Sequence, residues 1–110
     1  MAVAGAVSSP AARQVTSAAE FMGWKWVHWR PLRTKHGWQT PYDGPLGKGW
    51  PDLTLTHERK QRMVFAELKS ATGEVSAEQQ DLIDYLQRCG QEAYIWRPAD
   101  LSGILAILAR

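Results

Sequence analysis

Two short stretches decide the fold of this chain: Trp50-Pro51-Asp52-Leu53-Thr54-Leu55 and Val64-Phe65-Ala66-Glu67-Leu68-Lys69. Both predict β-strands, and the charged segment 57–61 between them predicts a turn, so the pair is expected to form a hairpin. Side chains two residues apart in a strand point to the same face, roughly 6.5 Å apart. Glu67 and Lys69 are therefore expected on one face, with Leu68 on the other. Asp52, on the neighbouring strand, can reach the same neighbourhood.

Asp52, Glu67 and Lys69 together predict a metal-dependent site. Two carboxylates and one ammonium at the edge of a sheet suit a hard divalent cation and a water molecule, and this is the chemistry of phosphodiester hydrolysis. The simpler interpretation is a surface ion pair between Glu67 and Lys69, which would contribute well under about 1 kcal/mol. The functional interpretation is favoured because charges in an otherwise apolar strand are costly unless a metal or substrate uses them.

The segments around the hairpin predict a single α/β domain over residues 10–110, preceded by a flexible tail over residues 1–9. The expected elements are a helix from Ser9-Pro10 to Met22, a strand over 24–30, hairpin strands over 51–56 and 62–69, a helix capped by Ser76 and closed by Gly90, a strand over 92–97 and a short final helix after Pro98. The order is α-β-β-β-α-β-α. A helical crossover between the strands 62–69 and 92–97 implies a parallel pair, so the sheet is mixed and flanked by helices. No regular element is expected over 32–50, and so long a loop in a small domain is more often functional than idle.

The helix after the hairpin carries a cap and an apolar face. Ser76 and Gln79 have the spacing of a capping box. The apolar stripe is expected to consist of Leu82, Tyr85, Leu86 and Cys89. Gln79 is expected to continue this stripe toward the end of the sheet. Cys89 is the only cysteine, which excludes a disulfide framework, and it is expected to be a buried thiol in a reducing compartment.

Basic and aromatic residues concentrate in the middle of the chain, although the net charge of all 110 residues is only +2. Residues 24–62 contain eight Lys or Arg against three acids, and they hold five of the six tryptophans. Basic residues interleaved with aromatic ones suit a phosphate backbone with unstacked bases nearby. The residues expected to contact DNA are Lys25, His28, Arg30, Arg33, Lys35, His36, Trp38 and Lys48.

Some of these residues also have a simpler interpretation as parts of the core or of the solvated surface. The tryptophans expected in the core are Trp24, Trp26 and Trp29. Trp38 and Trp50 lie in the segment without predicted structure, and both interpretations stay open for them. His28 is expected to pack or to contact a phosphate rather than to catalyse, and His57 is expected to be solvated in the hairpin turn.

A set of short motifs extends the hairpin pattern over most of the chain. They are Gly49-Trp50-Pro51-Asp52-Leu53, Phe65-Ala66-Glu67-Leu68-Lys69-Ser70, Ser76-Ala77-Glu78-Gln79, Gly90, and Tyr94-Ile95-Trp96-Arg97-Pro98 followed by Asp100, together with Gly23-Trp24 after a first helix bearing Arg13-Gln14-Val15. These motifs resemble the PD-(D/E)XK nucleases, and in detail their virus-type replication-repair nuclease (VRR-NUC) branch. The resemblance runs from about Arg13 over nearly the whole chain, so it is far more specific than the three-residue signature alone.

The resemblance implies a divalent-metal-dependent DNA endonuclease with Mg²⁺ or Mn²⁺ as its cofactor. It implies that Asp52 and Glu67 are metal ligands, with the backbone carbonyl of Leu68 as a third ligand. Lys69 would position or activate the attacking water and stabilise developing charge. Gln79 would be the active-site glutamine of the helix that follows the hairpin.

One departure from the family pattern lies in the first helix. The family often has a glutamate early in this helix, whereas the positions that would align with it hold Pro10, Ala11 and Ala12. Glu20 lies a few turns later and is not expected to be equivalent.

The resemblance also implies the biological setting. Small stand-alone members resemble phage or bacterial enzymes, many of which cut branched DNA as homodimers. We therefore expect a homodimer that acts on Holliday junctions or flaps in replication, recombination or repair. It is expected in the cytoplasm of a bacterium or a phage-infected cell, without membrane association.

Two other classes of protein compete with the nuclease hypothesis. The first is a catalytically inactive DNA-binding module on the same fold, which the missing first-helix glutamate and the modest net charge favour. The second is an assembly protein, which rests on the aromatic content alone and would leave the grouping of Asp52, Glu67 and Lys69 as a coincidence.

Overall fold

A four-stranded mixed sheet forms the centre of the structure, which the computed structural model describes for residues 10–110. The predicted tail over residues 1–9 and the predicted cap at Ser9 lie outside the described residues. The strand order is β1 (Lys25–His28), β4 (Leu53–His57), β5 (Arg62–Leu68) and β6 (Glu92–Trp96). The pairs β1–β4 and β4–β5 are antiparallel and the pair β5–β6 is parallel. The predicted hairpin and the predicted crossover are therefore both confirmed.

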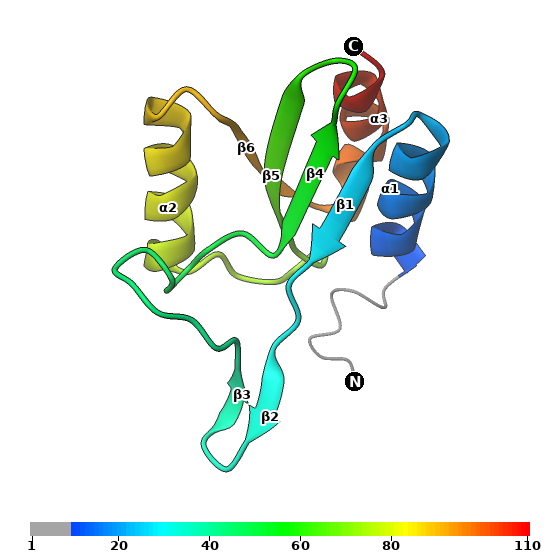
Figure 1. The fold of residues 1–110 in the computed structure, drawn as a ribbon. Helices are drawn as coiled ribbons and strands as arrows, with labels where there is room; N and C mark the ends of the chain where they lie inside the picture. Colours follow the sequence, from blue (N-terminus) through cyan, green and yellow to red (C-terminus); the bar gives the residue numbers. More distant parts are fainter. Residues whose placement is uncertain (1–9) are drawn as a thin grey trace.

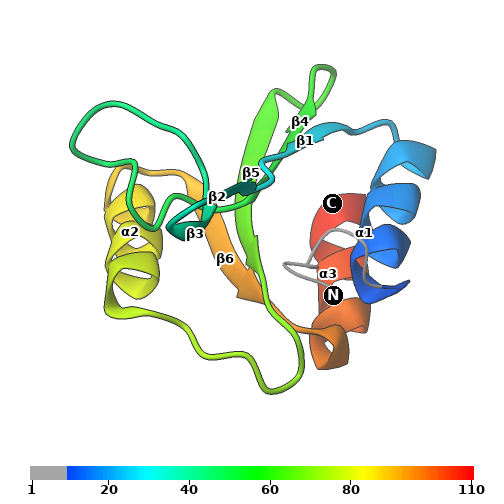
Figure 2. The same cartoon turned by 90° about the horizontal axis from the view of Figure 1, so that it is seen from below.

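Helices cover the two faces of this sheet. Helices α1 (Pro10–Phe21) and α3 (Leu101–Ala109) lie side by side on one face, and α2 (Ala77–Arg88) lies on the other (Figures 1 and 2). A short 3₁₀ turn, η2 (Pro98–Asp100), connects β6 to α3. The result is a small α/β domain with a mixed sheet flanked by helices, as expected. No helix within residues 10–110 is long and apolar enough to span a membrane.

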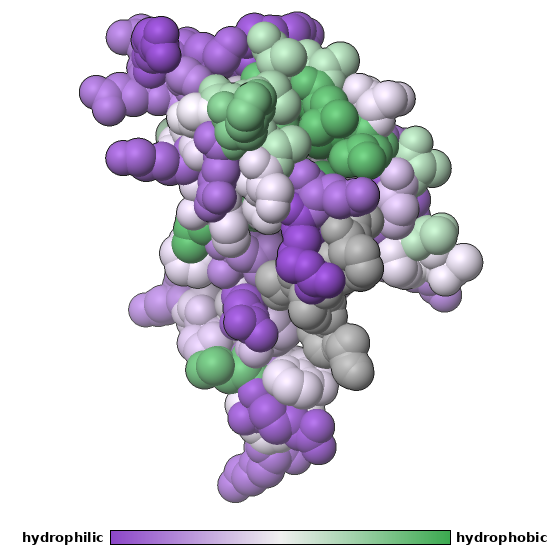
Figure 3. All heavy atoms as spheres, turned by 90° about the vertical axis from the view of Figure 1, so that its right-hand side faces the viewer, coloured by the Kyte–Doolittle hydropathy of each residue, from purple (hydrophilic) through white to green (hydrophobic). Residues whose placement is uncertain are grey.

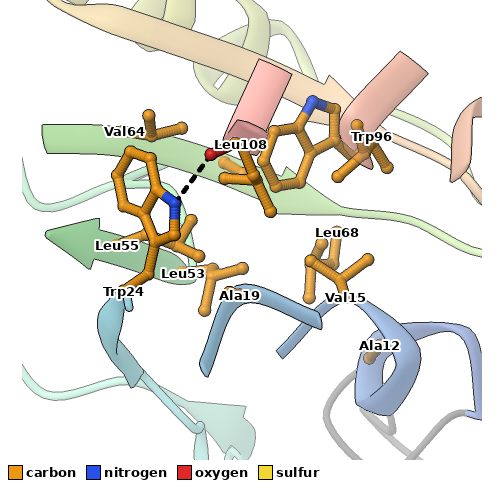
Figure 4. Close-up of a cluster of buried hydrophobic side chains, with 12 residues drawn as sticks. Ala12, Val15, Ala19, Trp24, Leu53, Leu55, Val64, Leu68, Trp96 and Leu108 are labelled. Carbon is orange, nitrogen blue, oxygen red and sulfur yellow. Dashed lines mark hydrogen bonds between the residues drawn. The ribbon is translucent and has the colours of Figure 1, made fainter. Parts of the chain in front are cut away.

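The larger hydrophobic core lies between the sheet and the pair α1–α3. Directly opposite residues in an antiparallel pair point to the same face, and the register pairs Leu53 with Ala66 and Leu55 with Val64. These side chains and Leu68 are all buried in this core. The view in Figure 4 shows how they meet residues of α1 and α3, and how the indole Nε1 of Trp24 donates to the carbonyl of Leu108 over 2.9 Å. The alternate residues of β5, which include Glu67, therefore point to the other face of the sheet, toward α2.

A smaller core lies under α2 and corrects the predicted stripe of that helix. Its buried members are Leu82, Ile83, Leu86 and Ala93. Tyr85 is 41 % exposed, and Cys89, at the C-cap of the helix, is exposed rather than buried. The stripe follows the i, i+3, i+4, i+7 spacing from Gln79 to Leu86 and includes Ile83 in place of Tyr85, so the expected place of Gln79 on it is confirmed. Cys89 lies beyond this stripe, so the predicted buried thiol was wrong.

The segment 32–50 contains regular structure that was not expected. Strands β2 (Leu32–Thr34) and β3 (Gly37–Gln39) form a separate two-stranded hairpin that projects from the sheet (Figure 1). The turn is closed by Thr34, whose hydroxyl donates to the carbonyl of Gly37 over 2.8 Å and accepts from the amide of His36 over 3.1 Å. Strands of three residues are too short to leave a recognisable alternation in the sequence. Residues 40–50 contain no strand or helix.

The tryptophans and His57 divide differently from the prediction. Trp24 is buried as expected, but Trp26 and Trp29 are 37 % and 49 % exposed. β1 is an edge strand, so its residues have a neighbouring strand on one side only. His57 is buried, not solvated: Nε2 lies 3.0 Å from the carbonyl of Met22, and Nδ1 accepts from the amide of Lys60 over 3.2 Å.

Candidate active site

The predicted catalytic residues meet at the open end of the β4–β5 hairpin, opposite its turn. Asp52 directly precedes β4, and its Oδ1 accepts a hydrogen bond from the backbone amide of Leu68, near the end of β5, over 2.9 Å. The backbone carbonyl of Asp52 also accepts from the amide of Trp29 over 2.7 Å. Asp52 is therefore tied to both neighbouring strands, which fixes where its carboxylate lies.

Glu67 and Lys69 lie on the same face of β5, as their spacing predicts. The ammonium Nζ of Lys69 is 3.6 Å from Oε2 of Glu67, and both side chains are largely buried. Burial is the main reason that the pKa of Glu67 is raised from its ordinary value to about 7, and the negative charge of Asp52 raises it further. The ammonium of Lys69 acts in the opposite direction. A carboxylate that is this costly to ionise is typical of a functional site.

Gln79 completes the group from the first turn of α2. Its side-chain Oε1 accepts from the backbone amide of Ser76 over 3.0 Å, and its backbone amide donates to the Ser76 hydroxyl over 3.1 Å. This is the predicted capping box, and it leaves Nε2 free to donate to Oε2 of Glu67 over 3.0 Å. The cap of the helix thereby places a hydrogen-bond donor on the buried carboxylate.

An open cleft of about 1400 Å³ runs past these residues. Its lining includes Asp52, Glu67, Lys69 and Gln79, together with the continuous segment 38–52. Small-molecule pockets usually enclose about 300–1,000 Å³. A larger open cleft beside a projecting hairpin is better suited to a polymeric substrate.

The segment that lines the cleft is anchored at its C-terminal end. Gly49 has φ of +86°, and a Cβ there would lie 2.7 Å from backbone atoms of Glu78, so only glycine allows this close approach to α2. Lys48 lies 3.4 Å from the Glu78 carboxylate. The ring of Trp50 contacts the ring of Phe65 edge-on, with 5.8 Å between centroids. Residues 48–50 are therefore packed on α2 and β5, immediately before Asp52 in the chain.

The structure separates the residues predicted to contact DNA into distinct places. Trp38 and Lys48 line the cleft. Arg33 lies over the ring of Trp38, 5.6 Å from its centroid, on the β2–β3 hairpin. Lys35 and His36 form the turn of this hairpin, and Arg30 lies between β1 and β2; all three are exposed. Lys25 pairs with Thr56. It therefore lies at the end of β1 that is far from Asp52.

His28 differs from the other residues of the predicted DNA-contact group in being buried beside Asp52. Its side chain is only 5 % exposed, and Nε2 lies 3.4 Å from Oδ2 of Asp52. His28 lines the cleft, but the burial of its side chain leaves little of it accessible to a phosphate. Its assignment as a DNA contact stays a prediction. Register explains the position: His28 pairs with Leu53, the residue that follows Asp52. The alternation of residues 24–28 was visible in the sequence, but the strand with which it pairs was not.

The departure in the first helix is also clear in the structure. Ala12 is part of the larger core. Glu20 accepts a hydrogen bond from the indole Nε1 of Trp26 over 2.9 Å, and it does not line the cleft. The described part of α1 therefore adds no carboxylate to the group around Asp52.

The donor set at this site consists of hard oxygen atoms. Within residues 10–110 no three or more His, Cys, Asp or Glu side chains are arranged to hold a metal ion. The two carboxylates of Asp52 and Glu67 remain, and Mg²⁺ commonly uses only one or two carboxylates and keeps several waters. The site fits such an ion better than it fits zinc, which takes three or four protein ligands.

Comparison with protein families gives a match over the site. The family model described as VRR-NUC domain matches residues 40–99, more than half of the chain. This chain belongs to the VRR-NUC family. The family is one of nucleases, and the matched residues include Asp52, Glu67, Lys69 and Gln79, whereas β1 with His28 lies outside them. Comparisons with curated proteins and with solved structures found no match.

Proposed function

We propose that this protein is a divalent-metal-dependent endonuclease that hydrolyses phosphodiester bonds in branched DNA, such as flaps or Holliday junctions. The observation that carries the proposal is the grouping of Asp52, Glu67, Lys69 and Gln79 at one end of the sheet, inside a cleft of about 1400 Å³. We further propose that it serves replication, recombination or repair in a bacterium or a phage-infected cell. This setting rests on the family resemblance.

The two carboxylates would hold Mg²⁺ or Mn²⁺, with the Leu68 carbonyl as an additional ligand. A bound ion of this kind lowers the pKa of a coordinated water and polarises a phosphoryl oxygen. Glu67 is costly to ionise without a nearby cation, because burial and the charge of Asp52 raise its pKa to about 7. A divalent cation between the two carboxylates would remove this repulsion, which supports the assignment of both as ligands.

Lys69 and Gln79 would act around this centre. Lys69 supplies a compact positive charge 3.6 Å from Glu67, and a lysine in this position can orient the attacking water and stabilise charge on the scissile phosphate. Gln79 donates to Oε2 of Glu67 and so leaves the other oxygen, Oε1, for a ligand. Both residues would be preorganised, since their partners are already in place in the folded chain.

The cleft and the β2–β3 hairpin would bind the DNA. Arg33, Lys35 and Lys48 offer positive charge for the backbone, while Trp38 and Tyr42 are 55 % and 59 % exposed beside the cleft. Exposed rings stack on bases that are not held in a duplex. This combination supports a substrate with unpaired bases, such as the branch point of a flap or junction.

We also propose that the active form is a homodimer. Family resemblance motivates this, and exposed apolar surface is available to support it. Apolar residues gather on part of the side that carries α1 and α3 (Figure 3), and Phe21 at the end of α1 is 93 % exposed. Light scattering coupled to size-exclusion chromatography should give twice the monomer mass, and Phe21→Glu is the first variant to test for loss of the dimer.

The decisive experiment is a cleavage assay on matched linear, flapped and four-way-junction DNA with Mg²⁺ or Mn²⁺. Wild-type protein should cut at least one branched substrate faster than the linear duplex, and chelation or Glu67→Ala should abolish cutting. Binding of DNA by Glu67→Ala, measured by fluorescence anisotropy, should persist. Cutting of all substrates by Glu67→Ala would contradict the proposal.

A catalytically inactive DNA-binding module is the second candidate. It is favoured by the absence of a metal-holding cluster of three or more side chains in the described part of the chain. This alternative predicts salt-sensitive DNA binding by a folded wild-type protein that cuts no substrate and binds no Mn²⁺ in calorimetry.

A further inference from the structure

His28 is a buried histidine whose hydrogen-bonding capacity is unused. Its side chain is 5 % exposed, and within residues 10–110 neither Nδ1 nor Nε2 has a hydrogen-bond partner. An imidazole always carries at least one N–H, so a buried ring without partners loses the hydrogen bonds that water gave it. Such a group in a native site is better explained by a role there than by packing.

The Asp52 carboxylate lies close to this ring. Nε2 of His28 is 3.4 Å from Oδ2, a few tenths of an ångström beyond an ordinary N–H···O hydrogen bond. Catalytic hydrogen bonds are often long in the absence of ligands and shorten when the site is loaded. Oδ2 is also the oxygen that the Leu68 amide does not use, since that amide donates to Oδ1.

His28 reaches Asp52 from the opposite side of the sheet to Glu67. Because His28 pairs with Leu53, it belongs to the face that packs on α1 and α3, where Leu53 and Leu68 are buried (Figure 4). Glu67, Lys69 and the first turn of α2 lie on the other face. The Asp52 carboxylate therefore lies at the end of the sheet between the backbone amide of Leu68 in β5 and the imidazole of His28 in β1.

We propose that His28 is a positioning residue for Asp52, in which the Nε2–H group directs Oδ2 while the Leu68 amide holds Oδ1, so that the carboxylate is fixed for metal binding. The inference rests on the proposed function of the site. Donors to a ligating carboxylate restrict its rotation and are typically worth 10–100-fold in metal affinity. Direct ligation by His28 is disfavoured, because His28, Asp52 and Glu67 do not form a metal-holding cluster.

Metal affinity without DNA tests this role. Mn²⁺ binding to the full chain is measured by calorimetry for wild type, His28→Ala and His28→Gln, with His57→Ala as the matched control. His57 is a second buried histidine, but it lies at the turn end of the hairpin and both its nitrogens are engaged. We expect His28→Ala to raise the Mn²⁺ Kd about tenfold or more. His28→Gln, whose amide nitrogen can replace Nε2–H, should restore most of the affinity.

The control separates positioning from stability. His57→Ala should lower the unfolding temperature but leave the Mn²⁺ Kd within about twofold of wild type, since it touches no residue near Asp52. If His57→Ala does not fold, His57→Gln serves as the control. An unchanged Kd in a folded His28→Ala protein, with Mn²⁺ bound normally by wild type, would overturn the inference and leave the proposed nuclease function intact.

A metal-free measurement tests the same contact independently. Long-range ¹H–¹⁵N correlation spectra should show His28 as the Nε2–H tautomer, and Asp52→Asn should shift the ring nitrogens of His28 but not those of His57. A wild-type Nδ1–H tautomer would overturn the inference. No Mn²⁺ binding by wild type would overturn both the inference and the proposed function.

Discussion

The β4–β5 hairpin has two polar ends that are built from similar residues and behave in opposite ways. At the turn end, Arg62 donates to both carboxylate oxygens of Glu92 over 2.8 and 2.7 Å, and also to the carbonyl of Ile107 over 3.2 Å. At the open end, Glu67 lies beside a second acid, Asp52, and its pKa is raised to about 7. The pKa of Glu92 is instead lowered, mainly by the hydrogen bond from Arg62.

The two buried histidines show the same contrast. His57 at the turn end uses both ring nitrogens, one toward Met22 and one toward Lys60. His28 at the open end uses neither, although its side chain is only 5 % exposed. The turn end of the hairpin thus satisfies both nitrogens of its histidine within the chain, while the open end leaves both nitrogens of its histidine without a partner. A functional site is expected to be less satisfied than the rest of the protein, because its groups must bind something else.

The largest test of this contrast removes the acid at the open end. Asp52→Asn should lower the rate of DNA cutting by about a thousandfold or more, since loss of a metal ligand removes several kcal/mol of transition-state stabilisation. The variant should stay folded, because its side-chain oxygen can still accept from the Leu68 amide. Single-turnover cleavage measures the loss, and anisotropy checks that DNA binding is retained. Full cutting would remove Asp52 from the site.

The second test measures how much ionisation of Glu67 lowers the free energy of unfolding. Folding raises the pKa of Glu67 from 4.5 to about 7, so the folded protein resists ionisation that the unfolded chain accepts. Below about pH 4.5 the group is neutral in both states; above about pH 7 it is ionised in both, and the folded state carries the full penalty. Without metal, the free energy of unfolding of Glu67→Gln should therefore rise by about 3 kcal/mol relative to that of wild type as pH increases through this window.

Denaturant unfolding in the presence of a chelator, at several pH values, measures this difference between variant and wild type. Addition of Mg²⁺ should close the gap by stabilising wild type alone, because the variant lacks the second carboxylate. A stability difference that does not change with pH would show that folding does not raise the pKa of Glu67.

The third test breaks the satisfied end. Arg62→Ala should lower the free energy of unfolding by about 2 kcal/mol, because it removes two charge-assisted hydrogen bonds and leaves Glu92 only the weaker contacts of Tyr94 and Arg110. The ring of Trp24, 5.0 Å below the guanidinium, loses a contact as well. The Mn²⁺ Kd should not change. A loss of metal affinity equal to that of His28→Ala would mean that the two ends are not independent.

The smallest expected effect concerns DNA binding beyond the hairpin. Lys35→Ala, at the tip of the β2–β3 turn, should reduce the slope of log affinity against log salt by about one. Lys60→Ala is the matched control, because Lys60 lies at the turn end of the main hairpin and donates to the C-terminal carbonyls of Ala109 and Arg110. Equal changes in both variants would remove the projecting hairpin from the DNA-binding surface.

Much of the site could be predicted because it depends on local spacing. The alternation in β5 places Glu67 and Lys69 together, and the Ser76–Gln79 capping box puts Gln79 on the first turn of α2. A short turn then brings Asp52 back beside β5. Each of these relations is set by backbone geometry within a few residues or one hairpin.

Other features depend on contacts between distant segments, and these were missed. The exposure of Tyr85 and Cys89 depends on which side of α2 faces β6, and the burial of His57 depends on where α1 ends. Trp26 and Trp29 are exposed because β1 happens to be an edge strand. A single sequence carries no direct signal for any of these pairings.

The sequence by itself determined the α/β class, the hairpin, the crossover and the four residues Asp52, Glu67, Lys69 and Gln79, because periodicity, caps and short turns are local properties. Only the tertiary structure decided that β1 pairs with β4 in the register that sets His28 beside Leu53. That register depends on burial summed over β1, α1 and α3, which lie far apart in the chain. The same long-range packing places Nε2 of His28 3.4 Å from Oδ2 of Asp52.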